Sequence, residues 1–114
     1  MAYPSREQLE VCRRVGARPD VPRPDQVVGL GPIGALPVNG LRHPPDGQSC
    51  GWYLWTGAEI DRTDDSFFSP IHVSHLGDHD PAVLPYLALP AGWRFQIGPD
   101  HEDIWFDSGL LAPE

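Results

Sequence analysis

Fourteen prolines and twelve glycines interrupt this 114-residue chain at short intervals, and this punctuation constrains the fold more than any other feature. Proline removes a backbone donor and glycine favours turns, so both residue types divide a chain into short elements. Apolar residues make up 40% of the chain and charged residues 21%, which is typical of a globular protein with one modest core. We therefore expect a single α+β domain over residues 1–114, built on an antiparallel sheet with short helices.

The first sixteen residues predict a short helix. Ser5 and Gln8 have the spacing of a capping box, and Gly16 is a typical C-terminal stop. The apolar stripe of this helix is formed by Leu9, Val11, Cys12 and Val15. Residues 17–26 are rich in proline and predict an extended connector, which leaves residues 27–114 as the body that contains the sheet.

Three segments have the two-residue alternation of a β-strand, namely residues 51–56, 93–97 and 103–107. The sequence GPDHE separates the last two segments and predicts a hairpin. A second short helix is expected near residues 81–89, because Asp80-Pro81 is a favourable helix start, and Pro85 should shorten or kink it.

The four tryptophans lie in or beside these strands, and each can bury a large apolar surface. We expect Trp52, Trp93 and Phe95 in the core. Trp55 and Trp105 fall on the opposite strand faces, where we expect them to be exposed and able to anchor a partner.

The formal net charge of −8 is unevenly distributed along the chain. Residues 1–57 carry five acidic residues and six arginines, a balance of +1, whereas residues 58–114 carry eleven acidic residues and two arginines, a balance of −9. An acidic half of this size argues against binding to nucleic acid or to an anionic membrane, and it permits a basic protein partner. The N-terminal residues lack the apolar core of a signal peptide, so we expect a cytoplasmic protein.

The sequence offers few candidates for catalysis or metal binding. No Walker loop or nucleophile elbow is present, and the glycines from Gly29 to Gly34 are not followed by the helix that a dinucleotide site requires. We expect no enzymatic activity and no cofactor. The alternative function is a small ligand- or metal-binding accessory protein, in which His72, His75 and His79 supply the ligands.

Two blocks of the sequence resemble a bacterial family of immunity proteins of polymorphic toxin systems, formerly a domain of unknown function. The first block is CGWYLWTGAE, and its matching positions are Gly51, Trp52, Gly57 and Glu59. The second block is DPAVLPYLALPAGWRF, with matches at Asp80, Pro81, Tyr86, Leu87, Pro90, Gly92 and Phe95. The resemblance implies a protein that binds and neutralises a cognate toxin, and it brings no catalytic residues.

Two acidic clusters are the predicted contacts to such a toxin. The first comprises Glu59, Asp61, Asp64 and Asp65, and the second comprises Asp100, Glu102 and Asp103 in the hairpin turn. Toxins that cut nucleic acid need a basic cleft, which an acidic surface can occupy by charge complementarity. We therefore expect a basic toxin partner, with Trp55 or Trp105 as the desolvated anchor.

Overall fold

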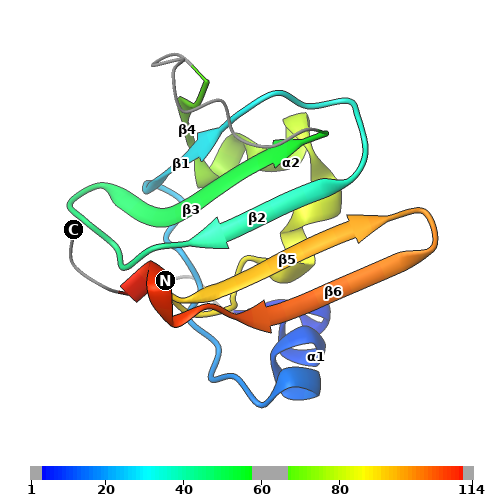
Figure 1. Cartoon of the computed structure of the whole chain (residues 1–114). Coiled ribbons are helices and arrows are strands. Elements are labelled where there is room, and N and C mark those ends of the chain that lie inside the picture. Colours follow the sequence, from blue (N-terminus) through cyan, green and yellow to red (C-terminus); the bar gives the residue numbers. More distant parts are fainter. Residues whose placement is uncertain (1–3, 58–66, 112–114) are drawn as a thin grey trace.

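The three expected strands and three others form one six-stranded sheet in the order β4-β1-β3-β2-β5-β6 (Figure 1). The structure is a computed structural model that describes residues 4–57 and 67–111. The strands are β1 (Val27–Leu30), β2 (Val38–Arg42), β3 (Ser49–Thr56), β4 (Ser69–His72), β5 (Trp93–Gly98) and β6 (His101–Phe106). The helical elements are α1 (Arg6–Val15), α2 (Leu76–His79) and three short 3₁₀ helices, η1 (Val73–His75), η2 (Pro81–Tyr86) and η3 (Ser108–Leu111). This arrangement confirms the α+β class.

Strand β3 lies inside the sheet, between β1 and β2. It pairs antiparallel with β2 but parallel with β1, so the sheet is mostly and not wholly antiparallel. Side chains on both faces of β3 are buried, since Trp52 is 0% exposed and Trp55, on the other face, is 6% exposed. The expectation that Trp55 is exposed was therefore wrong, whereas the expectation that Trp52 belongs to the core is confirmed.

Helix α1 begins with the predicted capping box. The Gln8 N–H donates to Ser5 Oγ at 3.1 Å, and the Ser5 N–H donates to Gln8 Oε1 at 2.9 Å. Gly16 ends the helix in the left-handed conformation, at a φ of 73°. The buried face is narrower than the predicted stripe, because Val11 and Cys12 are buried while Leu9 remains 47% exposed.

The core lies on one side of the sheet, where α2 and η2 lie behind the strands (Figure 1) and α1 packs against η2 with Val11 and Cys12 in the core. Trp52 Nε1 donates to the Leu87 oxygen at 2.9 Å, and the Tyr86 ring stacks on Phe95 with a centroid separation of 4.5 Å. Phe95 is 1% exposed, as expected, whereas Trp93 is only partly buried at the margin of the core. Gly40 has no side chain because a Cβ there would lie 2.3 Å from the Phe95 ring.

The core also contains Arg42, which is 1% exposed and which the sequence did not mark. Its Nε donates to the Cys50 oxygen at 3.0 Å, and one terminal nitrogen donates to the oxygens of Asp20 at 2.7 Å and Leu89 at 2.9 Å. These carbonyls belong to β3, to the connector and to the segment after η2. The guanidinium thus joins three separate segments through backbone acceptors, and it forms no salt bridge within the described residues.

Two local expectations need correction. The segment near residues 81–89 forms the 3₁₀ helix η2 over Pro81–Tyr86, and the Asp80 side chain makes no capping hydrogen bond. The β5–β6 turn is tighter than expected, because Gly98 pairs with His101 and leaves only two residues between the strands. Glu102 and Asp103 therefore lie within β6, and their side chains point to opposite faces of the sheet.

Candidate functional site

One face of the sheet is covered by helices, and the opposite face carries the candidate site. The register assigns residues to it, because residues directly opposite each other in an antiparallel pair share a face. Asn39 is paired with Trp55 and with Gln96, Gln96 with Asp103, and Arg94 with Trp105. We call this surface the open face because α2 and η2 lie on the other side of the sheet, and it comprises Asn39, Leu41, Tyr53, Trp55, Arg94, Gln96, Asp103 and Trp105. Three of these residues, Asn39, Leu41 and Trp55, are nevertheless buried. In Figure 1 the elements α2 and η2 lie behind the sheet, on the other side from this face.

Aromatic rings fill the β3 end of the open face. Tyr53 and Trp55 both contact Phe68, with centroid separations of 5.1 and 6.1 Å and ring planes close to perpendicular. Gly29, on β1, leaves room for the Tyr53 ring, which would lie 2.6 Å from an added Cβ. The Phe68 ring packs against Trp55 here, which helps to account for the burial of that tryptophan.

A polar hollow of about 220 Å³ lies between Trp55 and Trp105. Gln96 Nε2 donates to Asn39 Oδ1 at 2.9 Å on its floor. The Arg94 guanidinium lies 5.4 Å from the centre of the Trp105 ring and forms a salt bridge of 3.2 Å with Asp107. Trp105 remains 39% exposed, which confirms the expectation of an exposed ring at this position. An amide floor beside an exposed ring can receive a partner side chain but contains no nucleophile.

The predicted acidic cluster of the hairpin divides into two parts. Asp100 and Asp103 are exposed and form no salt bridge within the described residues. Glu102 faces the helices instead, where it accepts from Arg14 at 2.7 Å and from the Tyr86 hydroxyl. The hydrogen bonds from Arg14 and then Tyr86 lower the pKa of Glu102. Glu102 therefore joins β6 to α1 and η2, a role that its place in a run of acids did not reveal.

The other acidic cluster, Glu59, Asp61, Asp64 and Asp65, lies outside the described residues. The residues on either side of this cluster lie near the open face. Gly57 lines the polar hollow, and the Phe67 ring packs on Phe68 at a centroid separation of 4.9 Å.

A comparison with protein families identifies the family of this chain. The family model described as the Imm33-like domain matches residues 7–107, from the first turn of α1 to the residue after β6. The chain belongs to the Imm33-like domain family. This membership indicates an immunity-protein-like family. Comparisons with curated proteins and with solved structures give no match.

The cysteines of this Imm33-like domain are not arranged for catalysis. Cys12 and Cys50 are buried, at 1% and 0% exposure, and both are free thiols. Burial raises the pKa of each thiol, so the reactive thiolate is disfavoured.

The three histidines of the alternative function do not gather into a metal site. The rings of His72 and His75 lie 5.9 Å apart, and His79 is at the end of α2. Within residues 4–57 and 67–111, no three His, Cys, Asp or Glu side chains are placed to hold a metal ion. Among the same residues no helix is long and apolar enough to cross a membrane.

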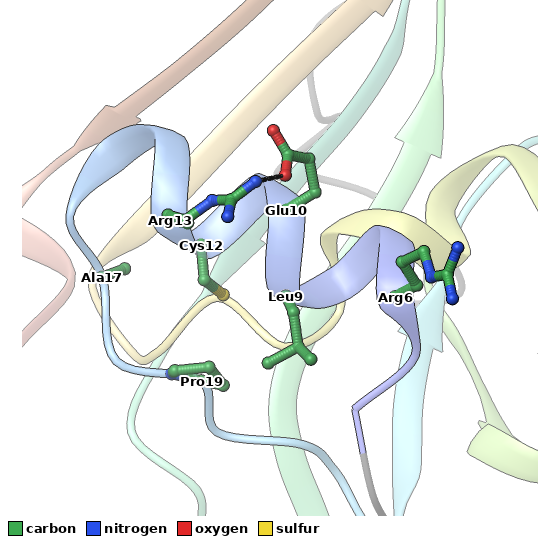
Figure 2. Close-up of a pocket in the computed structure, with 7 residues that line it drawn as sticks. All are labelled: Arg6, Leu9, Glu10, Cys12, Arg13, Ala17 and Pro19. Carbon is green, nitrogen blue, oxygen red and sulfur yellow. Dashed lines mark hydrogen bonds and ion pairs between the residues drawn. The ribbon is translucent and has the colours of Figure 1, made fainter.

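A larger hollow, of about 500 Å³, lies between α1 and the connector of the Imm33-like domain (Figure 2). The sequence did not predict this hollow, because its position depends on how α1 packs beside the connector. Cys12, Ala17 and Pro19 supply apolar lining, and the ion pair between Arg13 and Glu10 lies at its margin. The exposed Leu9 also lines this hollow.

Proposed function

We propose that this protein is a cytoplasmic immunity protein that binds and neutralises a cognate toxin of a polymorphic toxin system. Membership of the Imm33-like domain family supports the general role. The observation that carries the proposal is the open face itself. A sheet face on the side opposite α2 and η2, with Trp105 39% exposed beside the polar hollow, combines an exposed aromatic ring with polar surroundings, as protein-binding surfaces do.

The chemistry of the site favours binding over catalysis. Two polar side chains of the hollow, Gln96 and Asn39, are joined to each other, and Arg94 is paired with Asp107 through a terminal nitrogen, although its buried Nε has no hydrogen-bond partner among the described residues. The two thiols are buried behind the opposite face. A toxin inhibited by occupancy needs no reacting group, only a complementary surface that excludes its substrate.

The toxin surface that fits is basic. Asp103 is exposed on the same face as Trp105 and Asp100 is exposed in the hairpin turn, and we propose that Glu59, Asp61, Asp64 and Asp65 also contribute to toxin binding. Charges of this kind steer association more than they increase affinity, whereas a desolvated aromatic anchor governs dissociation. The acidic groups would therefore speed association with the toxin, and the Trp105 ring would slow its dissociation.

The first experiment tests the anchor. The probe is the toxin domain encoded beside this gene, produced with its active site inactivated for binding and intact for growth assays. Trp105→Ala should weaken binding by about 30-fold or more, which corresponds to about 2 kcal/mol, and should abolish the relief of growth arrest. Leu9→Ala removes an equally exposed apolar side chain from α1 and should leave both unchanged. Equal affinities for the two variants would show that the open face is not the interface.

The second experiment tests the charges. The pair Asp100→Asn and Asp103→Asn should slow association at low salt and flatten its salt dependence, and so should the set Asp61→Asn, Asp64→Asn and Asp65→Asn. The control pair, Glu7→Gln and Glu10→Gln, removes the same charge from α1 and should have a smaller effect. Unchanged association rates across salt in both acidic sets would mean that the negative charge only keeps the protein soluble.

A further inference from the structure

Strand β6 forms one edge of the sheet, because it pairs with β5 alone. Five of its six residues are exposed. The direction of its backbone groups follows from the pairing with β5. The Asp107 N–H donates to the Gly92 oxygen at 2.7 Å, one step beyond the pair formed by Trp93 and Phe106. Hydrogen-bonded pairs alternate along an antiparallel ladder, so His101, Asp103 and Trp105 direct their backbone groups toward β5.

The backbone N–H and C=O groups of Glu102, Ile104 and Phe106 consequently point out of the sheet. Outside the strand ladders, no backbone–backbone hydrogen bond within the described residues uses these groups. The pairing of β2 supports the same alternation, because the His43 N–H donates to the Gly51 oxygen on the β3 side while Arg42 directs its carbonyl to Gly92. A row of outward donors and acceptors is a template for one more strand.

The two edges of the sheet differ in how they oppose pairing. The opposite edge strand, β4, has only four residues and contains Pro70, which has no N–H to donate. Strand β6 has six residues and no proline. The feature that opposes pairing at β6 is charge, through the exposed Asp103, since Glu102 is already paired with Arg14.

This edge could pair with a second copy of the chain or with a strand of another protein, and its negative charge favours one of the two. Residues 100–107 carry four acidic side chains and no lysine or arginine. Glu102 is paired with Arg14 and Asp107 with Arg94, so two copies paired edge to edge would bring together mainly the carboxylates of Asp100 and Asp103, and this like charge disfavours self-association. A positively charged strand would instead be attracted to these carboxylates. We propose that β6 is the docking edge for the toxin, and that an extended basic segment of the toxin adds to it as a further strand.

This inference rests on the proposed function and specifies how the toxin binds. An added strand lies about 4.8 Å beyond β6, with its side chains alternating between the two faces. On the open face they reach Asp103 and Trp105, which suit lysine or arginine by charge and by contact with the ring. On the other face they reach Phe106, which is 50% exposed and suits an apolar side chain. The docking segment therefore alternates basic and apolar residues.

Amide hydrogen exchange measured by NMR tests the alternation directly. In the free protein, the amides of Glu102, Ile104 and Phe106 should exchange quickly, because their N–H groups face solvent. Bound to the inactivated toxin domain, these three amides should slow by at least about tenfold, while those of Asp103 and Trp105 change less because β5 already protects them. If the toxin binds and the three amides exchange as before, strand addition is wrong and the proposed function stands. If the toxin does not bind at all, both fail.

A proline variant with a matched alanine gives an independent test. Ile104→Pro removes one outward N–H without removing a β5–β6 hydrogen bond, and Ile104→Ala removes the same side chain but keeps that N–H. We expect Ile104→Pro to bind the toxin domain at least about tenfold more weakly than Ile104→Ala, with similar circular dichroism. Equal affinities would overturn the inference. So would a free protein that sediments as a dimer with the three amides already protected, because a second copy would then occupy the edge.

Discussion

Replacing Arg42 by Met measures what a buried guanidinium contributes to this fold. Two effects oppose each other. Burial lowers the pKa of Arg42, which shows that the charged form is desolvated in the core. Against this cost stand the hydrogen bonds to the oxygens of Cys50, Asp20 and Leu89, at 3.0, 2.7 and 2.9 Å. A hydrogen bond to a charged group contributes about 1.5–3 kcal/mol, and a buried acceptor left alone costs about 1–3 kcal/mol.

The methionine variant keeps the apolar stem and removes all of these donors. We expect the free energy of unfolding to fall by about 3–5 kcal/mol, a large part of the roughly 5–15 kcal/mol of a typical domain. Urea unfolding followed by tryptophan fluorescence measures it, since Trp52 lies in the same core. Arg13→Met, at a side chain 78% exposed, should change stability by no more than about 0.5 kcal/mol. A loss below about 1 kcal/mol for Arg42→Met would show that desolvation cancels the hydrogen bonds, and that the carbonyls do not need this cation.

Three further perturbations test the remaining packing. Hydrogen bonds from Arg14 and Tyr86 lower the pKa of Glu102 below its ordinary value, so the charged carboxylate stabilises the fold at neutral pH and this contribution is lost as the pH falls through the folded pKa. When urea unfolding midpoints are measured at a series of pH values, Glu102→Gln should therefore reduce the loss of stability in acid. Cys12 and Cys50 should react with a thiol reagent only on unfolding, and rapid labelling of the native protein would contradict their burial. Gly40→Ala should cost about 1–3 kcal/mol, because its Cβ would lie 2.3 Å from a buried ring, and a thermal melt equal to wild type would refute that close packing.

Local patterns in the sequence predicted the local features of this fold. The capping box at Ser5 and the stop at Gly16 depend only on neighbouring residues, and both are present. The two-residue alternation correctly placed Trp52 and Phe95 on the buried face of their strands. These features need no knowledge of which strands pair.

The errors arise where a side chain depends on distant segments. Trp55 was expected to be exposed because it faces away from the core, but Phe68 packs on that face too. Glu102 belongs to a run of acids, and only the docking of α1 supplies Arg14 as its partner. Arg42 is buried because carbonyls from three separate segments converge on it, and no spacing in the sequence records that convergence.

The open face was only partly predictable for the same reason. Trp105 and Asp103 were chosen from composition and strand parity, which give the face of a residue but not its neighbours. The hollow formed with Asn39 and Gln96 requires β2 to pair with β5. That pairing joins residues far apart in the chain, and alternation within a single strand cannot reveal it.

A stoichiometric titration tests the central claim, that this protein neutralises a toxin by occupying it. Purified active toxin domain is mixed with increasing amounts of the protein, well above the dissociation constant, and residual toxin activity is measured at each molar ratio. Inhibition by binding predicts a linear decrease that ends at a fixed ratio near one equivalent and is unchanged by longer incubation. Loss of activity at a small fraction of an equivalent, progressing with time, would reveal catalytic turnover, and full activity at excess protein would exclude neutralisation of that toxin.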